Sequence, residues 1–162
     1  MWHDSAMIWK QLAALTLAAT IGGASAEPQT PPSLAEMVKL LDARRPDTPG
    51  EAQAMLGTPL KCDAGFCNGG PISLRDVKIG RIDFRQLGNG PFLALDSLSG
   101  GCIAPDSLSR KIALSIPMNG CSDGFTCMYR FANRPWGRFS VSVPNDPEAK
   151  QCAQSVIFDA MK

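Results

Sequence analysis

The stretch RIDFRQLGNGPFLAL, residues 81–95, predicts two antiparallel strands joined by a tight turn. Polar and apolar side chains alternate in residues 81–85, which is the period-two pattern of a strand with one buried face. The Gly-Asn-Gly-Pro sequence at residues 88–91 favours a turn, and the apolar residues 92–95 supply the returning strand. The hairpin indicates a sheet of the antiparallel type.

Helices are predicted before and after this hairpin. Ser33 with Glu36 and Thr48 with Glu51 match the capping-box pattern, in which each residue of the pair binds the backbone N–H of the other. A third, short helix is predicted at residues 105–112. Apolar residues recur at helical spacing after the first box, at Leu34, Met37, Val38 and Leu41.

Two more strands are predicted near the C-terminus. Phe and Val alternate with Ser in residues 139–143, which indicates a strand with one buried face, and residues 156–158 form a final buried strand. Strands and helices together predict an α+β fold. Gly and Pro, 15 and 13 residues, favour many turns over long helices.

The N-terminal residues read as a signal for export. A charged start at Lys10, an apolar run at residues 12–21 and an Ala-Ser-Ala end predict a signal peptide at residues 1–26. The apolar run is too short to span a membrane, which needs about 20 residues. Residues 27–32, rich in Pro, are expected to form an extended leader. A periplasmic or secreted location follows.

Six cysteines are expected to form three disulfides, because an even count in an exported chain indicates disulfides rather than metal ligands. No paired C-x2-C spacing, which a zinc site would use, is present. Six cysteines permit 15 pairings. The cysteines are Cys62, Cys67, Cys102, Cys121, Cys127 and Cys152.

Short echoes between the two halves predict a tandem of two small helix-plus-antiparallel-sheet units, residues 33–101 and 102–162. CDAGFC at residues 62–67 resembles CSDGFTC at residues 121–127, and Gly-Arg-Ile and Leu-Asp in the first half resemble Gly-Arg-Phe and Phe-Asp in the second. Each unit would hold a helix, a Cys-loop and about three strands. Symmetry would then pair Cys62 with Cys67, Cys121 with Cys127, and Cys102 with Cys152, with a Cys102–Cys121 bridge as the rival.

Composition excludes several chemistries. The net charge is +1, and the single histidine, His3, lies in the expected signal peptide, which leaves no imidazole for a catalytic triad or a metal site. Phosphate-binding and nucleophile-elbow motifs are missing, and no cofactor or metal is expected. A hydrolase with paired carboxylates stays open as an alternative, with the aspartates equally explained as turn and strand-end residues. The candidates are Asp63 with Asp123 and Asp96 with Asp159.

The segment YRFANRPWGR, residues 129–138, is the best candidate for contact with a partner. It holds the only Tyr and the only Trp beyond residue 26, and it also contains arginines. Tyr, Trp and Arg are the residue types common in interface hot spots. In a hairpin, residues 133–135 would form the exposed tip. The alternative is that Trp136 lies in the core under arginine side chains. The predicted binding residues are Arg130, Arg134, Trp136 and Arg138.

A resemblance adds to this reading. The helical segment at residues 33–61, ending AMLGTP at residues 54–59, resembles the SmpA/OmlA outer-membrane assembly lipoproteins, although the chain has no lipobox. The duplicated, disulfide-looped plan is similar to β-lactamase inhibitory protein modules. Both resemblances imply a non-catalytic envelope module that binds another protein.

Three functions are therefore expected, in this order of preference. The first is non-enzymatic binding of another exported or envelope protein, inhibitor-like or assembly-like. The second is a histidine-free carboxylate hydrolase acting on envelope polysaccharide, and the third a carrier of a small anionic ligand, since arginines suit an anionic surface. Binding of nucleic acid is not expected, given the near-zero net charge and the export signal.

Overall fold

The computed structural model describes residues 30–112, 116–117, 121–122, 126–144 and 149–160. The expected signal peptide lies outside these residues, as does the first half of the predicted leader. The described residues form three helices, α1 (Leu34–Ala43), α2 (Pro49–Leu56) and α3 (Pro105–Ile112). They also form ten strands, which are β1 (Leu60–Asp63), β2 (Phe66–Gly69), β3 (Ile72–Ser73), β4 (Lys78–Leu87), β5 (Gly90–Ser99), β6 (Ile116–Pro117), β7 (Cys121–Ser122), β8 (Thr126–Arg134), β9 (Gly137–Pro144) and β10 (Ser155–Asp159).

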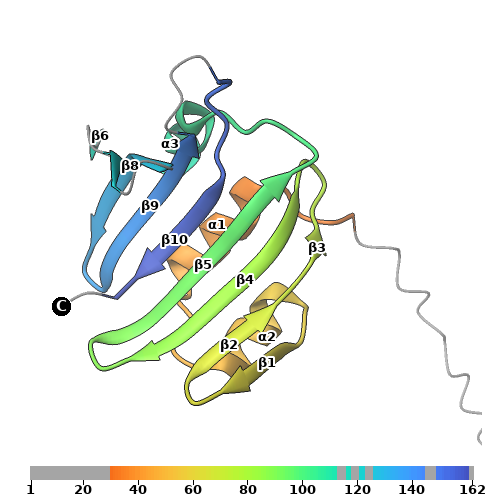
Figure 1. Ribbon diagram of the computed structural model, residues 1–162, viewed down its shortest axis with the longest axis vertical. Coiled ribbons are helices and arrows are strands. Elements are labelled where there is room, and N and C mark those ends of the chain that lie inside the picture. The colour runs from red at the N-terminus through yellow and green to blue at the C-terminus, as the bar shows by residue number, and fades with distance from the viewer. Residues whose placement is uncertain (1–29, 113–115, 118–120, 123–125, 145–148, 161–162) are drawn as a thin grey trace, which may run out of the picture.

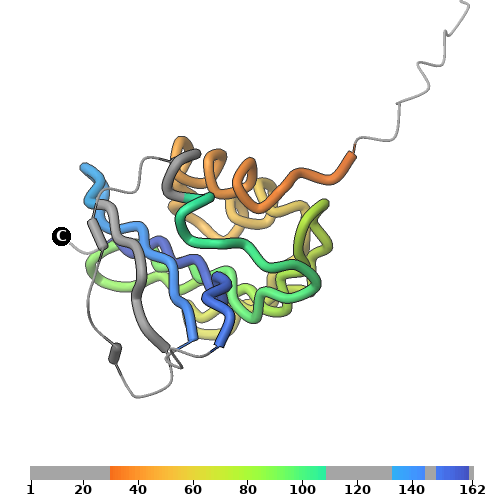
Figure 2. Tube along the Cα trace, turned by 90° about the horizontal axis from the view of Figure 1, so that it is seen from above, coloured from red at the N-terminus to blue at the C-terminus, as the bar shows by residue number. Residues whose placement is uncertain are grey.

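The strands make one antiparallel sheet, so the α+β fold is confirmed. Their order is β1-β2-β4-β5-β10-β9-β8-β6, with β3 paired to β4 and β7 paired to β8. The predicted hairpin is β4 and β5, with its turn at residues 88–89, and β10 lies beside β5 in the middle of the sheet (Figure 1). The helices lie on one face of the sheet (Figure 2).

Both predicted capping boxes are confirmed. The Ser33 hydroxyl accepts from the backbone N–H of Glu36 at 3.3 Å, and the Glu36 carboxylate accepts from the backbone N–H of Ser33 at 2.7 Å. Thr48 and Glu51 repeat this arrangement at the start of α2. Gly57 ends α2 in the left-handed conformation, with φ at 64°. Among the described helices, none is long and apolar enough to cross a membrane.

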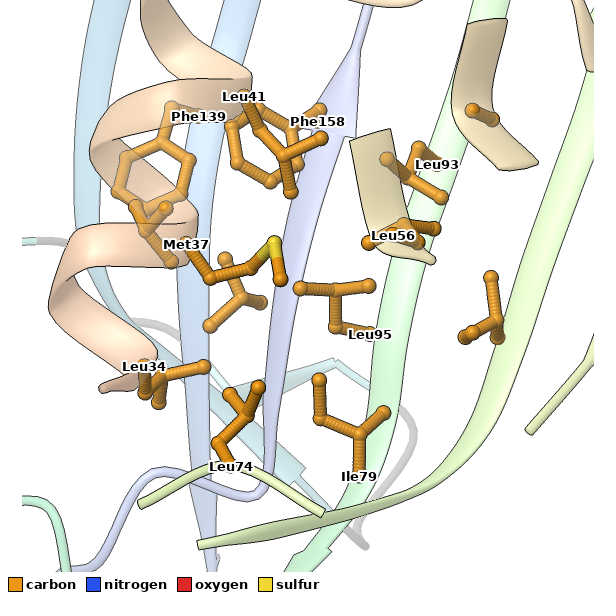
Figure 3. Close-up of a cluster of buried hydrophobic side chains, with 14 of the residues drawn as sticks. Leu34, Met37, Leu41, Leu56, Leu74, Ile79, Leu93, Leu95, Phe139 and Phe158 are labelled. Carbon is orange, nitrogen blue, oxygen red and sulfur yellow. The ribbon is translucent and has the colours of Figure 1, made fainter. Parts of the chain in front are cut away.

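The hydrophobic core fills the space between α1, α2 and the sheet (Figure 3). Leu34, Val38 and Leu41 of α1 are fully buried, which confirms the predicted helical spacing. The rings of Phe139 and Phe158 face them from β9 and β10, with centroids 4.9 Å apart. Burial of each large side chain contributes about 1.5–3 kcal/mol, so this layer is the main source of stability.

The prediction of one buried face for β9 was wrong. Ser140 and Ser142, which point away from the helices, are 7% and 4% exposed, as little as many core residues. Ser142 lies opposite Ser155 of β10, and their hydroxyl oxygens are 2.5 Å apart. Neighbouring strands on both sides cover these small side chains, and the hydroxyls satisfy each other, so polarity did not indicate exposure here.

The first Cys-loop, residues 62–67, is a hairpin of two strands joined by a turn at residues 64–65. Cys62 and Cys67 lie directly opposite each other in β1 and β2 and form a disulfide. A second disulfide joins Cys102 to Cys152, so the rival Cys102–Cys121 bridge was wrong. In the chain-entropy account, closing the long loop contributes about 4 kcal/mol and closing the short one about 2 kcal/mol. Cys121 faces Cys127 in the same register, but their side chains lie outside the described part of the chain.

Acid is expected to weaken the start of α1. Hydrogen bonds from the backbone N–H and the hydroxyl of Ser33, with the charge of Arg75, hold the pKa of Glu36 below its ordinary value of 4.5. A lowered folded-state pKa stabilises the fold at pH values above 4.5 and loses this effect as pH falls through the lowered pKa. Glu36→Gln should therefore reduce the free energy of unfolding at pH 7 and matter less at pH 3, in urea titrations. An equal effect at both pH values would contradict this.

Candidate functional site

A cleft of about 810 Å³ opens at one end of the sheet, between the β4–β5 turn and the β8–β9 turn. Its lining comes from residues 86–90, residues 133–138, Arg45 and Ala160. Both turns lie at the end of the sheet where β10 finishes (Figure 1). The cleft thus joins segments far apart in the sequence, because the central pairing of β5 with β10 brings the two hairpins to the same end.

Small residues form the floor of the cleft. A Cβ atom added to Gly137 would lie 2.1 Å from the carbonyl oxygen of Asp159, and one added to Gly90 would lie 2.8 Å from the Cβ of Ala160. Larger side chains therefore cannot be accommodated at these two positions without a shift of β10. Gly90 and Gly137 therefore allow both turns to lie close against the end of β10.

Trp136 forms one wall and also contacts the core. It is half-buried, and its ring centroid lies 6.1 Å from that of Phe158. The guanidinium of Arg45, which follows α1, lies over the Trp136 ring at 5.7 Å from the centroid. Its Nη1 donates to the carbonyl oxygen of Trp136 at 3.0 Å, and its Nε donates to Asp47 Oδ1 at 3.0 Å. Arg45 thereby holds the hairpin tip against the helical layer.

The other two arginines of the cleft are held by aspartates. Arg134 donates from Nε and Nη2 to the two carboxylate oxygens of Asp42 in α1, at 2.9 and 3.0 Å. Both side chains are 22% exposed, so this two-point ion pair is partly shielded from water. Arg138 donates from Nη2 to Asp159 Oδ2 at 3.2 Å, across the β9–β10 pair. The Arg134 guanidinium is thus fixed in orientation by two hydrogen bonds, and the Arg138 guanidinium is restrained by one.

Three of the four predicted binding residues, Arg134, Trp136 and Arg138, line this cleft. Arg130 lies on β8 with its backbone opposite Val141, and its side chain is outside the described residues. The hairpin turn falls at residues 135–136, not at the expected tip of residues 133–135, because Arg134 still pairs with Gly137.

Trp136 packs against the core, as the alternative interpretation expects, and it also lines the cleft; its contact with a partner stays a prediction. Sequence reasoning missed Arg45, Gln86 and Asn89. The turn containing Asn89 was predicted, but Arg45 lies 91 residues from Trp136 and carries no local signal of this contact.

A row of side chains crosses the strands of the sheet, from β2 near one edge to β8 beside the cleft. Arg85 lies between two rings, at 5.7 Å from the Phe66 centroid and 5.2 Å from the Phe92 centroid. Hydrogen bonds to Asp83 raise the pKa of the Arg85 guanidinium further. The row faces away from the helices and spans about 24 Å at the usual strand spacing. In register order across the strands, it consists of Phe66, Arg85, Phe92, Asp159, Arg138 and Asn133.

Two exposed apolar side chains adjoin these features. Phe66, at the outer end of the row, is 52% exposed, and Leu87, in the cleft wall, is 44% exposed. Exposed large apolar side chains next to fixed arginines and a tryptophan are typical of a surface that meets another molecule.

Of the two predicted carboxylate pairs, Asp96 and Asp159 do not come together in the way that a glycosidase requires, and the pair of Asp63 and Asp123 stays untested. The register places Asp96 opposite Ser155, four residues along β10 from Asp159, which gives a Cα separation of about 14 Å. Asp96 pairs with Arg81, and Asp159 pairs with Arg138. Asp63 lies on edge strand β1, and Asp123 is outside the described residues. Within the part of the chain that the structure covers, no cluster of acidic, Cys or His residues suits a metal ion.

Comparison with known proteins does not extend these observations. No protein-family model, no curated protein and no solved structure matches this chain. Any functional conclusion therefore depends on the geometry of the cleft and of the neighbouring row.

The Asp42–Arg134 pair is expected to couple the hairpin to α1. In a double-mutant cycle with Asp42→Ala and Arg134→Ala, the coupling free energy should be about 1 kcal/mol, as expected for a partly shielded two-point pair. Urea unfolding of the four proteins measures it. The matched control is the Glu36–Arg75 pair, whose side chains are 58% and 51% exposed, and its coupling should be smaller. Equal coupling in both cycles would show that shielding by the hairpin contributes nothing.

Proposed function

We propose that this chain is a non-enzymatic, exported module that binds another exported or envelope protein through the hairpin end of its sheet. The observation that carries the proposal is the cleft, in which Trp136 and three aspartate-paired arginines lie beside the exposed Leu87. Tryptophan and arginine dominate the energetics of protein interfaces when neighbouring groups hold them in place.

The shape of this end of the molecule supports a protein as the partner. The cleft and the row from Phe66 to Asn133 form a continuous surface, since Arg138 and Asn133 belong to both. At about 24 Å, the row alone is wider than a small ligand needs. The lining is also rich in polar groups. This composition suits a surface that is exposed to water when the partner is absent, as in a reversible complex.

Export is the second part of the proposal. The sequence pattern of residues 1–26 and the two disulfides support a periplasmic or secreted location, where disulfides persist. Within such a compartment, inhibitor-like and assembly-like roles are both consistent with a rigid binding surface.

A carrier of a small anionic ligand is the second candidate. The cleft volume of about 810 Å³ falls within the range of small-molecule sites, and three arginines line it. The capture experiment below separates the two, because a carrier would retain no stoichiometric protein.

We also propose that the chain is a tandem of two related units, residues 33–101 and 102–162, with a third disulfide between Cys121 and Cys127. The strand order supports this, because β1-β2-β4-β5 from one edge corresponds to β7-β8-β9-β10 from the other.

The third disulfide is tested by peptide mapping of the oxidised protein. Chymotrypsin cleaves after Phe125, between the two cysteines, so the fragments with Cys121 and Cys127 should stay linked until a reductant is added. Their opposed register, the same as that of Cys62 and Cys67, favours this bridge. Either cysteine recovered as a free thiol, or linked elsewhere, would refute it.

Capture tests the binding proposal. The immobilised oxidised protein should retain a stoichiometric protein from an envelope extract of the cells that produce it, and Leu87→Ala should reduce retention at least tenfold. Truncation of a well-placed apolar contact costs an interface about 1–2 kcal/mol or more. Trp136→Ala should act in the same direction.

Leu40→Ala is the matched control. Leu40 is 40% exposed, close to the 44% of Leu87, but lies on α1 and does not line the cleft. This variant should retain the partner normally. If the unmodified protein retains nothing, the binding proposal fails. If both leucine variants lose the partner equally, the site is not at the hairpin end.

A further inference from the structure

Resting on the proposed function, we infer that the cleft recognises an acidic segment of the partner protein, through carboxylate side chains bound by Arg45, Arg134 and Arg138. The inference adds the chemical class of the ligand to the binding site. It depends on the charges that face the cleft, on how the arginines are held, and on the size of the space between the two turns.

The charged groups that line the cleft have one sign. Among the described residues of its lining, three are arginines and none is an aspartate or glutamate. The aspartates that pair with these arginines, Asp42, Asp47 and Asp159, are not part of that lining. The charged side chains in the described lining are therefore all positive, which is the arrangement expected for recognition of an anion.

Pairing with aspartate does not prevent an arginine from binding a second carboxylate. A guanidinium carries five N–H donors in a planar fork, so it can bridge two carboxylates. In the cleft, two or more hydrogen bonds fix the planes of the Arg45 and Arg134 guanidiniums before any ligand arrives, and one bond to Asp159 restrains Arg138. A ligand carboxylate then meets donors that lose little conformational freedom on binding.

Neutral donors and apolar groups favour a peptide over a simple anion. The amides of Gln86, Asn89 and Asn133 line the same space and can bind a peptide backbone. Leu87 and Trp136 offer apolar contact at the rim. A volume of about 810 Å³ is far larger than one carboxylate or phosphate fills. An acidic segment with interspersed apolar residues can contact the arginines, the amides and the apolar side chains at the same time.

The probe is the acetylated and amidated pentapeptide Glu-Leu-Glu-Leu-Glu, compared with Gln-Leu-Gln-Leu-Gln. In the full chain with Trp2→Phe and Trp9→Phe, Trp136 is the only tryptophan, so its fluorescence reports on the cleft alone. The Glu peptide should shift this fluorescence with at least tenfold higher affinity than the Gln peptide, since hydrogen bonds to charged groups contribute more than neutral ones. Raising salt from about 50 to 500 mM should weaken the Glu peptide selectively.

Two variants test the arginines. Arg138→Gln should weaken the Glu peptide at least tenfold and leave the Gln peptide nearly unchanged. Arg75→Gln is the matched control, because Arg75 is also paired with a carboxylate, Glu36, but does not line the cleft. It should change neither affinity by more than twofold. The peptide comparison itself needs no cleft variant, so it remains decisive if Arg138→Gln disturbs folding.

Several outcomes would overturn the inference. These are no binding of the Glu peptide, equal binding of both peptides, equal effects of Arg138→Gln and Arg75→Gln, or full displacement of the Glu peptide by 10 mM inorganic phosphate or acetate. The last result would identify the cleft as a site for a small anion only. If the capture partner is lost with Leu87→Ala and the Glu peptide does not bind, protein binding stands and the acidic ligand is refuted. If no partner is captured but the Glu peptide binds selectively, protein binding is refuted and recognition of an acidic ligand stands.

Discussion

The rest of this structure depends on the antiparallel pairing of β5 with β10. Leu95 lies opposite Val156 and Leu93 opposite Phe158, so two sets of strands join into one sheet whose apolar face is continuous. The helices can then cover a single core instead of two small ones, which suits a chain of this size. Without this pairing, the strands on either side of the junction would each present an unpaired edge.

The cleft is a consequence of the same pairing. It brings the β4–β5 and β8–β9 turns to one end of the sheet, on either side of Ala160, and Gly90 and Gly137 let both turns lie close against the end of β10. Bonds from the helical layer, Arg45 to the Trp136 carbonyl and Asp42 to Arg134, then hold the second turn in place. Rigid scaffolding beneath two surface turns is the usual way for loops to form a binding site.

Local structure was predictable where the determining interactions are close in sequence. The capping box of Ser33 and Glu36 and the β4–β5 turn each depend on residues fewer than five positions apart. The burial of Ser142 was not predictable, since the partner of its hydroxyl is Ser155, 13 residues away and on a different strand. Arg134 and Trp136 were found because their residue types are common in interfaces, whereas Arg45 has no such local context.

By itself, the sequence determined the class of the fold, its principal helices and its central hairpin, because capping, periodicity and turn preferences act over a few residues. It also limited the chemistry, since the one histidine lies at position 3 and the rest of the chain offers no imidazole. Only the tertiary structure decided that residues 86–90 and 133–138 face each other and that Arg45 joins them. The physical reason is that these contacts depend on the order and register of the strands, which hydrogen bonds between distant segments establish.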